Sequence, residues 1–124
     1  MGSQENHFKL YEKFKKDAEN TNNFEGTRVE AYFLSAYHLI ESCAAQERVH
    51  INKHQHLRSI LTKNDFIFKD NTEYIWNFQK IENQLRPKFA YGFSWTEDDM
   101  KNVETCYKTI EQICLEKLGE DVNE

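Results

Sequence analysis

The stretch "TRVEAYFLSAYHLIESCAA", residues 27–45, decides the fold class of this chain. Its apolar residues recur every three or four positions, the spacing with which one face of an α-helix meets a core. They are Val29, Tyr32, Phe33, Ala36, Tyr37, Ile40, Cys43 and Ala44. Thr27, followed three residues later by Glu30, is typical of a helix N-terminus. The stretch therefore predicts a long central helix over residues 27–47.

The same spacing recurs on both sides of this helix. It predicts four further helices, near residues 8–20, 53–63, 72–85 and 97–118. Pro87 is expected to end the fourth helix of the chain by moving Arg86 out of the α region. Thr96 and Asp99 predict a capping box at the start of the last helix, and Gly119 predicts its end.

The composition favours helices over strands. Four glycines and one proline are too few for an all-β chain, which needs a turn about every 8–12 residues. We therefore expect an all-α fold: one antiparallel up-and-down bundle of four main helices plus one short helix, spanning residues 1–124. Residues 1–7 and 119–124 are expected to be flexible ends. The segment "FIFKD", residues 66–70, is predicted to be an apolar loop laid on the core rather than a paired strand.

Charge and cysteine content narrow the class of protein. The sequence has no long apolar run and no apolar leader, so we expect no membrane span and a cytoplasmic location. A net charge of −5 argues against nucleic-acid binding over the whole surface but leaves room for a local cationic site. No CxxC motif is present, and Cys43, Cys106 and Cys114 each fall on an apolar stripe. We interpret them as buried reduced thiols, and we expect neither a metal site nor a cofactor.

A candidate binding site lies in "ENQLRPKFAYG", residues 82–92, of which we expect "QLRPKFAYG", residues 84–92, to connect the last two long helices. Glu82 precedes Arg86 by four residues, a spacing at which a carboxylate can hold a guanidinium. Tyr91, in the following turn, can stack beside Arg86 and offer a hydroxyl. The alternative is that Arg86 is a solvated residue at a helix C-terminus. Lys88 is a weaker candidate in the same stretch.

Three stretches together resemble the HEPN (higher eukaryotes and prokaryotes nucleotide-binding) family. They are "EAYFLSAYHLIE", "KHQHLRSIL", and "ENQLRPKFAYG" followed by "SWTEDDMKNVETCYKTIEQICLEKL". The resemblance covers residues 8–118 and rests on the order and spacing of these stretches. It implies a small helical bundle of the kind found beside minimal nucleotidyltransferases and in many toxins and ribonucleases.

The resemblance also bears on activity. Ribonuclease members of the family carry an Arg-x4-6-His motif and pair two such motifs across a homodimer. Here Arg86 matches the arginine, but Tyr91 stands in place of the histidine, and no histidine follows residue 56. Imidazole transfers protons near neutral pH, whereas tyrosine ionises near pH 10. The resemblance therefore implies the nucleotidyltransferase-associated branch: a non-catalytic or regulatory partner of a minimal nucleotidyltransferase, with a nucleotide or RNA as ligand.

Two other functions stay open. One is a divergent ribonuclease toxin in which Arg86 acts with an earlier histidine, and the other is a plain protein-interaction bundle. In "RVHINKHQH", residues 48–56, the weaker candidates are His54 and His56, whose simpler interpretation is as polar surface residues. No catalytic residue is assigned.

Aromatic and apolar residues also predict two packing features. The apolar stripe of the central helix is wider than one core requires, which predicts a homodimer; the widening comes from Tyr32, Tyr37 and Leu39. Aromatic residues alternate in the stretch after Pro87, and we interpret two of them as closing the end of the bundle rather than as a stacking platform for bases; they are Phe89, Tyr91, Phe93 and Trp95.

Overall fold

The computed structural model of the chain describes residues 3–69, 71–91 and 95–122 and is all-helical over these ranges. Three long helices are α1 (Ser3–Glu19), α2 (Glu25–Gln46) and α6 (Glu97–Val122). Between α2 and α6 come three short helical elements: η1 (His54–His56), α3 (Leu57–Lys63) and η2 (Asp65–Phe68). A fourth long run follows, built from α4 (Glu73–Gln79), η3 (Lys80–Leu85) and α5 (Arg86–Tyr91).

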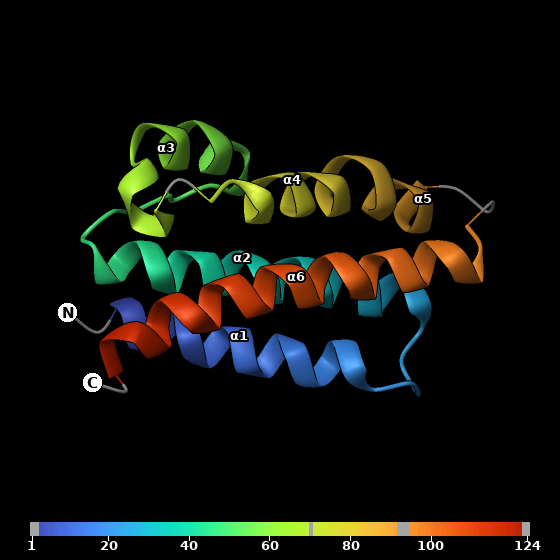
Figure 1. Cartoon of the computed structure of the whole chain (residues 1–124). Coiled ribbons are helices and arrows are strands. Elements are labelled where there is room, and N and C mark those ends of the chain that lie inside the picture. The colour runs from blue at the N-terminus through green and yellow to red at the C-terminus, as the bar shows by residue number, and fades with distance from the viewer. Residues whose placement is uncertain (1–2, 70, 92–94, 123–124) are drawn as a thin grey trace.

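The long elements alternate in direction. Figure 1 shows α2 and α6 in the middle, with α1 along one side and the α4–η3–α5 run along the other. The start of α1 and the end of α6 lie at the same end of the bundle. This arrangement confirms the predicted all-α antiparallel bundle of four main helices plus a short one.

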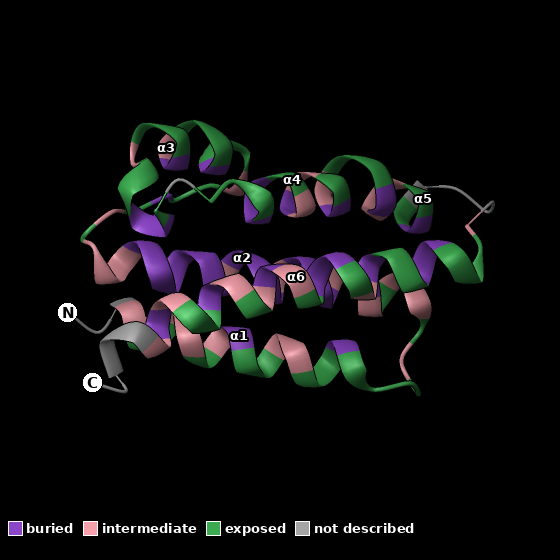
Figure 2. Ribbon diagram, viewed as in Figure 1, coloured by how far each residue is buried: buried purple, intermediate pink, exposed green. Residues whose placement is uncertain are grey.

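Helix α2 is the centre of the core. It packs against α1, α4, α5 and α6, and in Figure 2 its ribbon is mostly buried. The residues that widen its apolar stripe, Tyr32, Tyr37 and Leu39, are all buried within the single chain. The prediction that these residues form a dimer interface is therefore wrong, because neighbouring helices of the same chain cover them. The dimer itself stays a prediction.

The start of α2 differs from the prediction. The helix begins at Glu25, with Phe24 as the N-cap residue and no side-chain cap. The carbonyl of Phe24 already accepts the backbone N–H of Arg28, at 3.0 Å. Thr27 therefore lies within the first turn, and Glu30 is not a capping residue.

Pro87 does not end the helix. Arg86 keeps helical backbone angles, φ −54° and ψ −43°, and the helix continues to Tyr91. The turns before the proline widen to a π-helix, in which the Arg86 N–H bonds to the carbonyl of Ile81, five residues back. Proline lacks an N–H and its ring crowds the carbonyl four residues back in an α-helix. The π-turn shifts the hydrogen-bond partner one residue further back and so relieves this crowding. The predicted connection over residues 84–92 is therefore helical as far as Tyr91.

Replacing Pro87 tests the cost of this turn. Proline in a helix interior is about 3 kcal/mol less favourable than alanine, and the π-turn relieves part of that cost. We expect Pro87→Ala to raise the free energy of unfolding by about 1 kcal/mol, measured by urea denaturation. A decrease of that size would show instead that the ring stabilises the fold through its packing.

The start of α6 confirms the predicted capping box. The Thr96 backbone N–H donates to Oδ2 of Asp99 at 2.9 Å, and the Asp99 N–H donates to the Thr96 hydroxyl at 3.2 Å. The Thr96 N–H and, to a smaller extent, Lys88 hold the pKa of Asp99 below its usual range. The far end was predicted wrongly: α6 passes through Gly119 to Val122. No described glycine has a positive φ, so Gly119 does not adopt the left-handed conformation that ends many helices.

The chain ends, the "FIFKD" segment and the cysteines are next. Residues 3–7 are helical, as are 119–122, so these parts of the expected flexible ends belong to α1 and α6. "FIFKD" is not a strand in its described part: η2 buries Ile67 and Phe68. The predicted buried thiols are confirmed, since all three cysteines are free and buried. Of the helices in the described ranges, none is both long and apolar enough to cross a membrane.

Candidate functional site

Arg86 is held on two sides. Its Nε donates to Oε1 of Glu30 on α2 at 2.8 Å. Its guanidinium carbon lies 4.3 Å from the centre of the Phe33 ring, a cation–π contact. The side chain is 31% exposed, and its terminal N–H groups form no hydrogen bond with the described residues. These two contacts restrict the orientation of Arg86, and its terminal N–H groups are available to a ligand.

Glu82 has a different partner from the predicted one. Nδ1 of His54 donates to Oε2 of Glu82 at 2.6 Å, and Arg86 pairs with Glu30 instead. Both pairings join elements far apart in sequence, because α2 and η1 pack against the α4–η3–α5 run. A spacing of four residues allows Glu82 and Arg86 to meet on one face of a helix. Side chains on neighbouring elements are competing partners for both residues. The predicted Glu82–Arg86 pair is therefore wrong.

The ring of Phe33 joins Arg86 and His54 into one cluster. The His54 ring meets the Phe33 ring edge-on, with centres 5.1 Å apart. Phe78 of α4 stacks on the same ring at 5.2 Å. We call Arg86, Glu30, Phe33, His54 and Glu82 the Phe33 cluster. It combines a guanidinium, an imidazole and two carboxylates around a buried ring.

The other candidates lie outside this cluster. Lys88 pairs with Asp99 at the start of α6, with Nζ 3.1 Å from Oδ1. His56 is exposed on η1. Tyr91 is the last residue of α5, and its side chain lies outside the described part of the structure. The aromatic prediction is confirmed for one pair: Phe89 is buried and stacks on Trp95 at 4.8 Å.

Glu41 supports the cluster from the core and was missed by sequence reasoning. Its side chain is buried, accepting a bond from the Tyr37 hydroxyl at 2.9 Å and another from the Ile51 N–H at 3.2 Å. Burial, and secondarily Glu41, raise the pKa of Tyr37. Because Ile51 lies three residues before His54, Glu41 fixes the segment that carries the imidazole.

One signal in the sequence pointed to the carboxylates of Glu30 and Glu41, whose tertiary partners were not predicted. Glu30 and Glu41 continue the stripe of Phe33 and Tyr37 at intervals of three or four residues. A glutamate at a position that should face the core needs a hydrogen-bond partner there. The pattern therefore indicated buried or half-buried carboxylates on α2, although it did not identify their partners.

The geometry supports binding of an anion more directly than binding of a metal. A guanidinium with available N–H groups can donate two parallel bonds to a phosphate or carboxylate. In the described ranges, no group of three histidine, cysteine, aspartate or glutamate side chains is placed to hold a metal ion.

No family model matches the chain. Comparison with curated proteins and with solved structures gave no match either. The structure establishes a small all-helical domain, and HEPN stays a resemblance in the sequence.

Proposed function

We propose that this chain is a nucleotide- or RNA-associated helical bundle in which Arg86 contacts a phosphate. The HEPN resemblance suggests the wider role: a non-catalytic or regulatory partner of a minimal nucleotidyltransferase. In this role the chain itself forms a homodimer. The observation that carries the proposal is the placement of Arg86, which stacks on Phe33 and binds Glu30 through Nε.

This placement suits recognition of a phosphate. Glu30 and Phe33 restrict the side chain before a ligand arrives, so less conformational entropy is lost on binding. Glu82 binds His54, so among the described carboxylates only Glu30 is paired with the guanidinium. The terminal N–H groups are then available for a charge-assisted pair of bonds to phosphate oxygens. Tyr91, as the last residue of α5, is the proposed stacking or hydrogen-bonding neighbour.

The unpaired cysteines fit a cytoplasmic protein. Cys43, Cys106 and Cys114 are unpaired, and burial raises the pKa of both Cys106 and Cys114. Unpaired cysteines are the normal state in a reducing compartment. The proposed location is therefore the cytoplasm.

The test compares two arginines that both stack on aromatic rings. Arg86→Ala is expected to weaken binding of a mononucleotide or a short single-stranded RNA by about 1–3 kcal/mol, the range for a hydrogen bond to a charged group. It should change the free energy of unfolding by about 1 kcal/mol or less, because the ion pair with Glu30 is partly exposed. The measurements are calorimetric titration and urea denaturation.

The control is Arg58→Ala. Arg58 lies over Trp76 at 4.9 Å, so its removal also deletes an arginine–aromatic contact and one positive charge. We expect Arg58→Ala to leave nucleotide and RNA affinity unchanged. Equal losses of affinity in the two variants would show that only the total charge of the protein matters. Wild-type protein that bound neither ligand would contradict the proposal.

A divergent ribonuclease is the second candidate, and one observation favours it. Arg86 and His54 contact the same Phe33 ring, so an imidazole lies in the cluster although none follows Arg86 in the sequence. A carboxylate only accepts hydrogen bonds, so Nδ1 of His54 carries the hydrogen toward Glu82. In the neutral ring this leaves Nε2 as an acceptor, the arrangement of a histidine general base oriented by a carboxylate.

Substitution of the two neighbouring histidines tests this candidate. If the chain cleaves RNA, His54→Ala should lower the rate about 100-fold or more, since a general base contributes roughly 10² to 10⁴. His56→Ala removes an exposed imidazole two residues away and should leave the rate unchanged. The measurement is cleavage of a labelled RNA by purified protein. Cleavage that survives His54→Ala would eliminate the assigned role, and the absence of cleavage in wild type would eliminate the candidate.

A further inference from the structure

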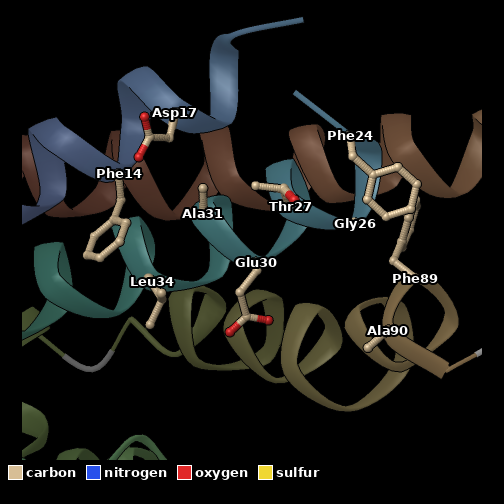
Figure 3. A pocket seen from close by; sticks show the side chains of 10 residues that line it. All are labelled: Phe14, Asp17, Phe24, Gly26, Thr27, Glu30, Ala31, Leu34, Phe89 and Ala90. Atoms are coloured by element: carbon tan, nitrogen blue, oxygen red, sulfur yellow. The ribbon is translucent and has the colours of Figure 1, made fainter. Parts of the chain in front are cut away.

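An open groove lies beside the Phe33 cluster, on the side of α2 between α1 and α5. Its volume is about 450 Å³, within the usual range of roughly 300–1,000 Å³ for ligand sites. Figure 3 shows the side chains that line it: Phe14 and Asp17 from α1, Leu34 and Glu30 from α2, and Phe89 and Ala90 from α5.

The groove is mainly apolar and aromatic. Phe14, Phe24 and Phe89 line it together with Leu34. Phe24 is 65% exposed, the most exposed of the large hydrophobic residues in the described part of the chain. Aromatic rings at the edge of a groove are typical anchor points for a protein partner.

The charges lining the groove have one sign. Asp17 and Glu30 contribute carboxylates, and no lysine, arginine or histidine is among the lining residues. Asp17 forms no ion pair with the described residues, whereas the charge of Glu30 is largely offset by its ion pair with Arg86. Carboxylates beside aromatic faces favour a cation, which both groups attract.

The floor of the groove is formed by small residues. Gly26, Thr27 and Ala31 line it from α2, and the Phe24 ring lies over Gly26. From Gly26 to Leu34 the groove follows α2 for about 12 Å, or roughly two helical turns. A methyl group added at Gly26 would come within 2.7 Å of the Phe24 ring, so the glycine sets where that ring lies.

We infer that this groove docks a basic amphipathic helix of a partner protein. Apolar side chains of the partner pack against Phe14 and Phe24 beside the buried Phe89, and a lysine or arginine is attracted to Asp17. A second copy of this chain, with a net charge of −5, complements an acidic groove poorly, so the proposed homodimer is expected to use another face. The inference does not depend on nucleotide or RNA binding by Arg86.

A pair of synthetic peptides tests the inference. One is a leucine–lysine amphipathic helix of about 14 residues, roughly four turns, and the other has glutamate in place of every lysine. The reporter is the fluorescence of Trp95, which stacks on Phe89 of the groove, in a protein carrying Trp76→Phe. Backbone amide shifts in nuclear magnetic resonance spectra locate the contact. We expect saturable binding of the lysine peptide, with shifts at Asp17, Thr27, Ala31 and Ala90, and no binding of the glutamate peptide.

Two variants and a matched control distinguish peptide binding in the groove from non-specific electrostatic attraction to the protein. Asp17→Lys should weaken the lysine peptide about tenfold or more through charge repulsion. Glu19→Lys changes net charge equally on the same helix, but Glu19 lies about 200° around α1 and should have little effect. Gly26→Ala should weaken binding several-fold by displacing Phe24, with the melting temperature unchanged or higher because alanine favours a helix. Glu30 is left intact because it also holds Arg86.

Three results with the peptides would overturn the inference: equal affinity for the two peptides, amide shifts outside the groove, and equal effects of Asp17→Lys and Glu19→Lys. A fourth concerns a small cation. Butylammonium alone should bind far more weakly than the peptide. If it bound with the peptide's affinity, the groove would be a small-cation site and not a docking surface. Nucleotide affinity is measured in the same Asp17→Lys variant, so loss of peptide binding with retained nucleotide binding separates this inference from the proposed function.

Discussion

Phe33→Ala is expected to lower the free energy of unfolding by about 3–5 kcal/mol, the range for deleting a buried aromatic ring. Phe33 is 1% exposed and stacks on Phe78, so its removal leaves a cavity between α2 and α4. Arg86 and His54 also rest against this ring and lose their shared support. This loss is a large share of the roughly 5–15 kcal/mol that stabilises a typical domain.

The measurement is urea denaturation followed by circular dichroism. Phe33→Leu is the control, because leucine refills much of the space but offers no aromatic face to the guanidinium. We expect Phe33→Leu to recover more than half of the lost stability while nucleotide affinity stays reduced, as in Arg86→Ala. If Phe33→Leu restored affinity as fully as stability, the ring would be only a space filler, and the cation–π contact would not position Arg86.

The second large effect is expected at Glu41. Glu41→Ala should lower the free energy of unfolding by about 2–4 kcal/mol, because it leaves two buried donors, the Ile51 N–H and the Tyr37 hydroxyl, without an acceptor. Glu41 is only 5% exposed, so water does not easily replace the lost carboxylate. The segment that leads to His54 should loosen as well.

Hydrogen exchange at the Ile51 amide measures this local effect, and urea denaturation measures the global one. Glu41→Gln keeps an acceptor oxygen at the same place and should lose less than half as much stability. We expect the Ile51 amide to exchange faster in Glu41→Ala than in Glu41→Gln. Equal stabilities in the two variants would show that the acceptor oxygen does not matter at this position.

Some features of this protein were determined by the sequence alone. The spacing of apolar residues in α2 was enough to predict a long helix at the centre of a bundle, because helical periodicity is a property of neighbouring residues. The box formed by Thr96 and Asp99 was predictable for the same reason: its two partners are three residues apart. The burial of the cysteines followed from their places on the apolar stripes.

Only the tertiary structure decided how the candidate site is assembled. The helix continues past Pro87 because a π-turn relieves the crowding and because Phe89 is buried in the core beyond it. Arg86 binds Glu30, 56 residues away, and His54 binds Glu82, 28 residues away. Local spacing made Glu82 the natural partner of Arg86. Packing of α2 and η1 against the α4–η3–α5 run brought other partners within hydrogen-bond distance, and which side chains meet across helices depends on how those helices cross.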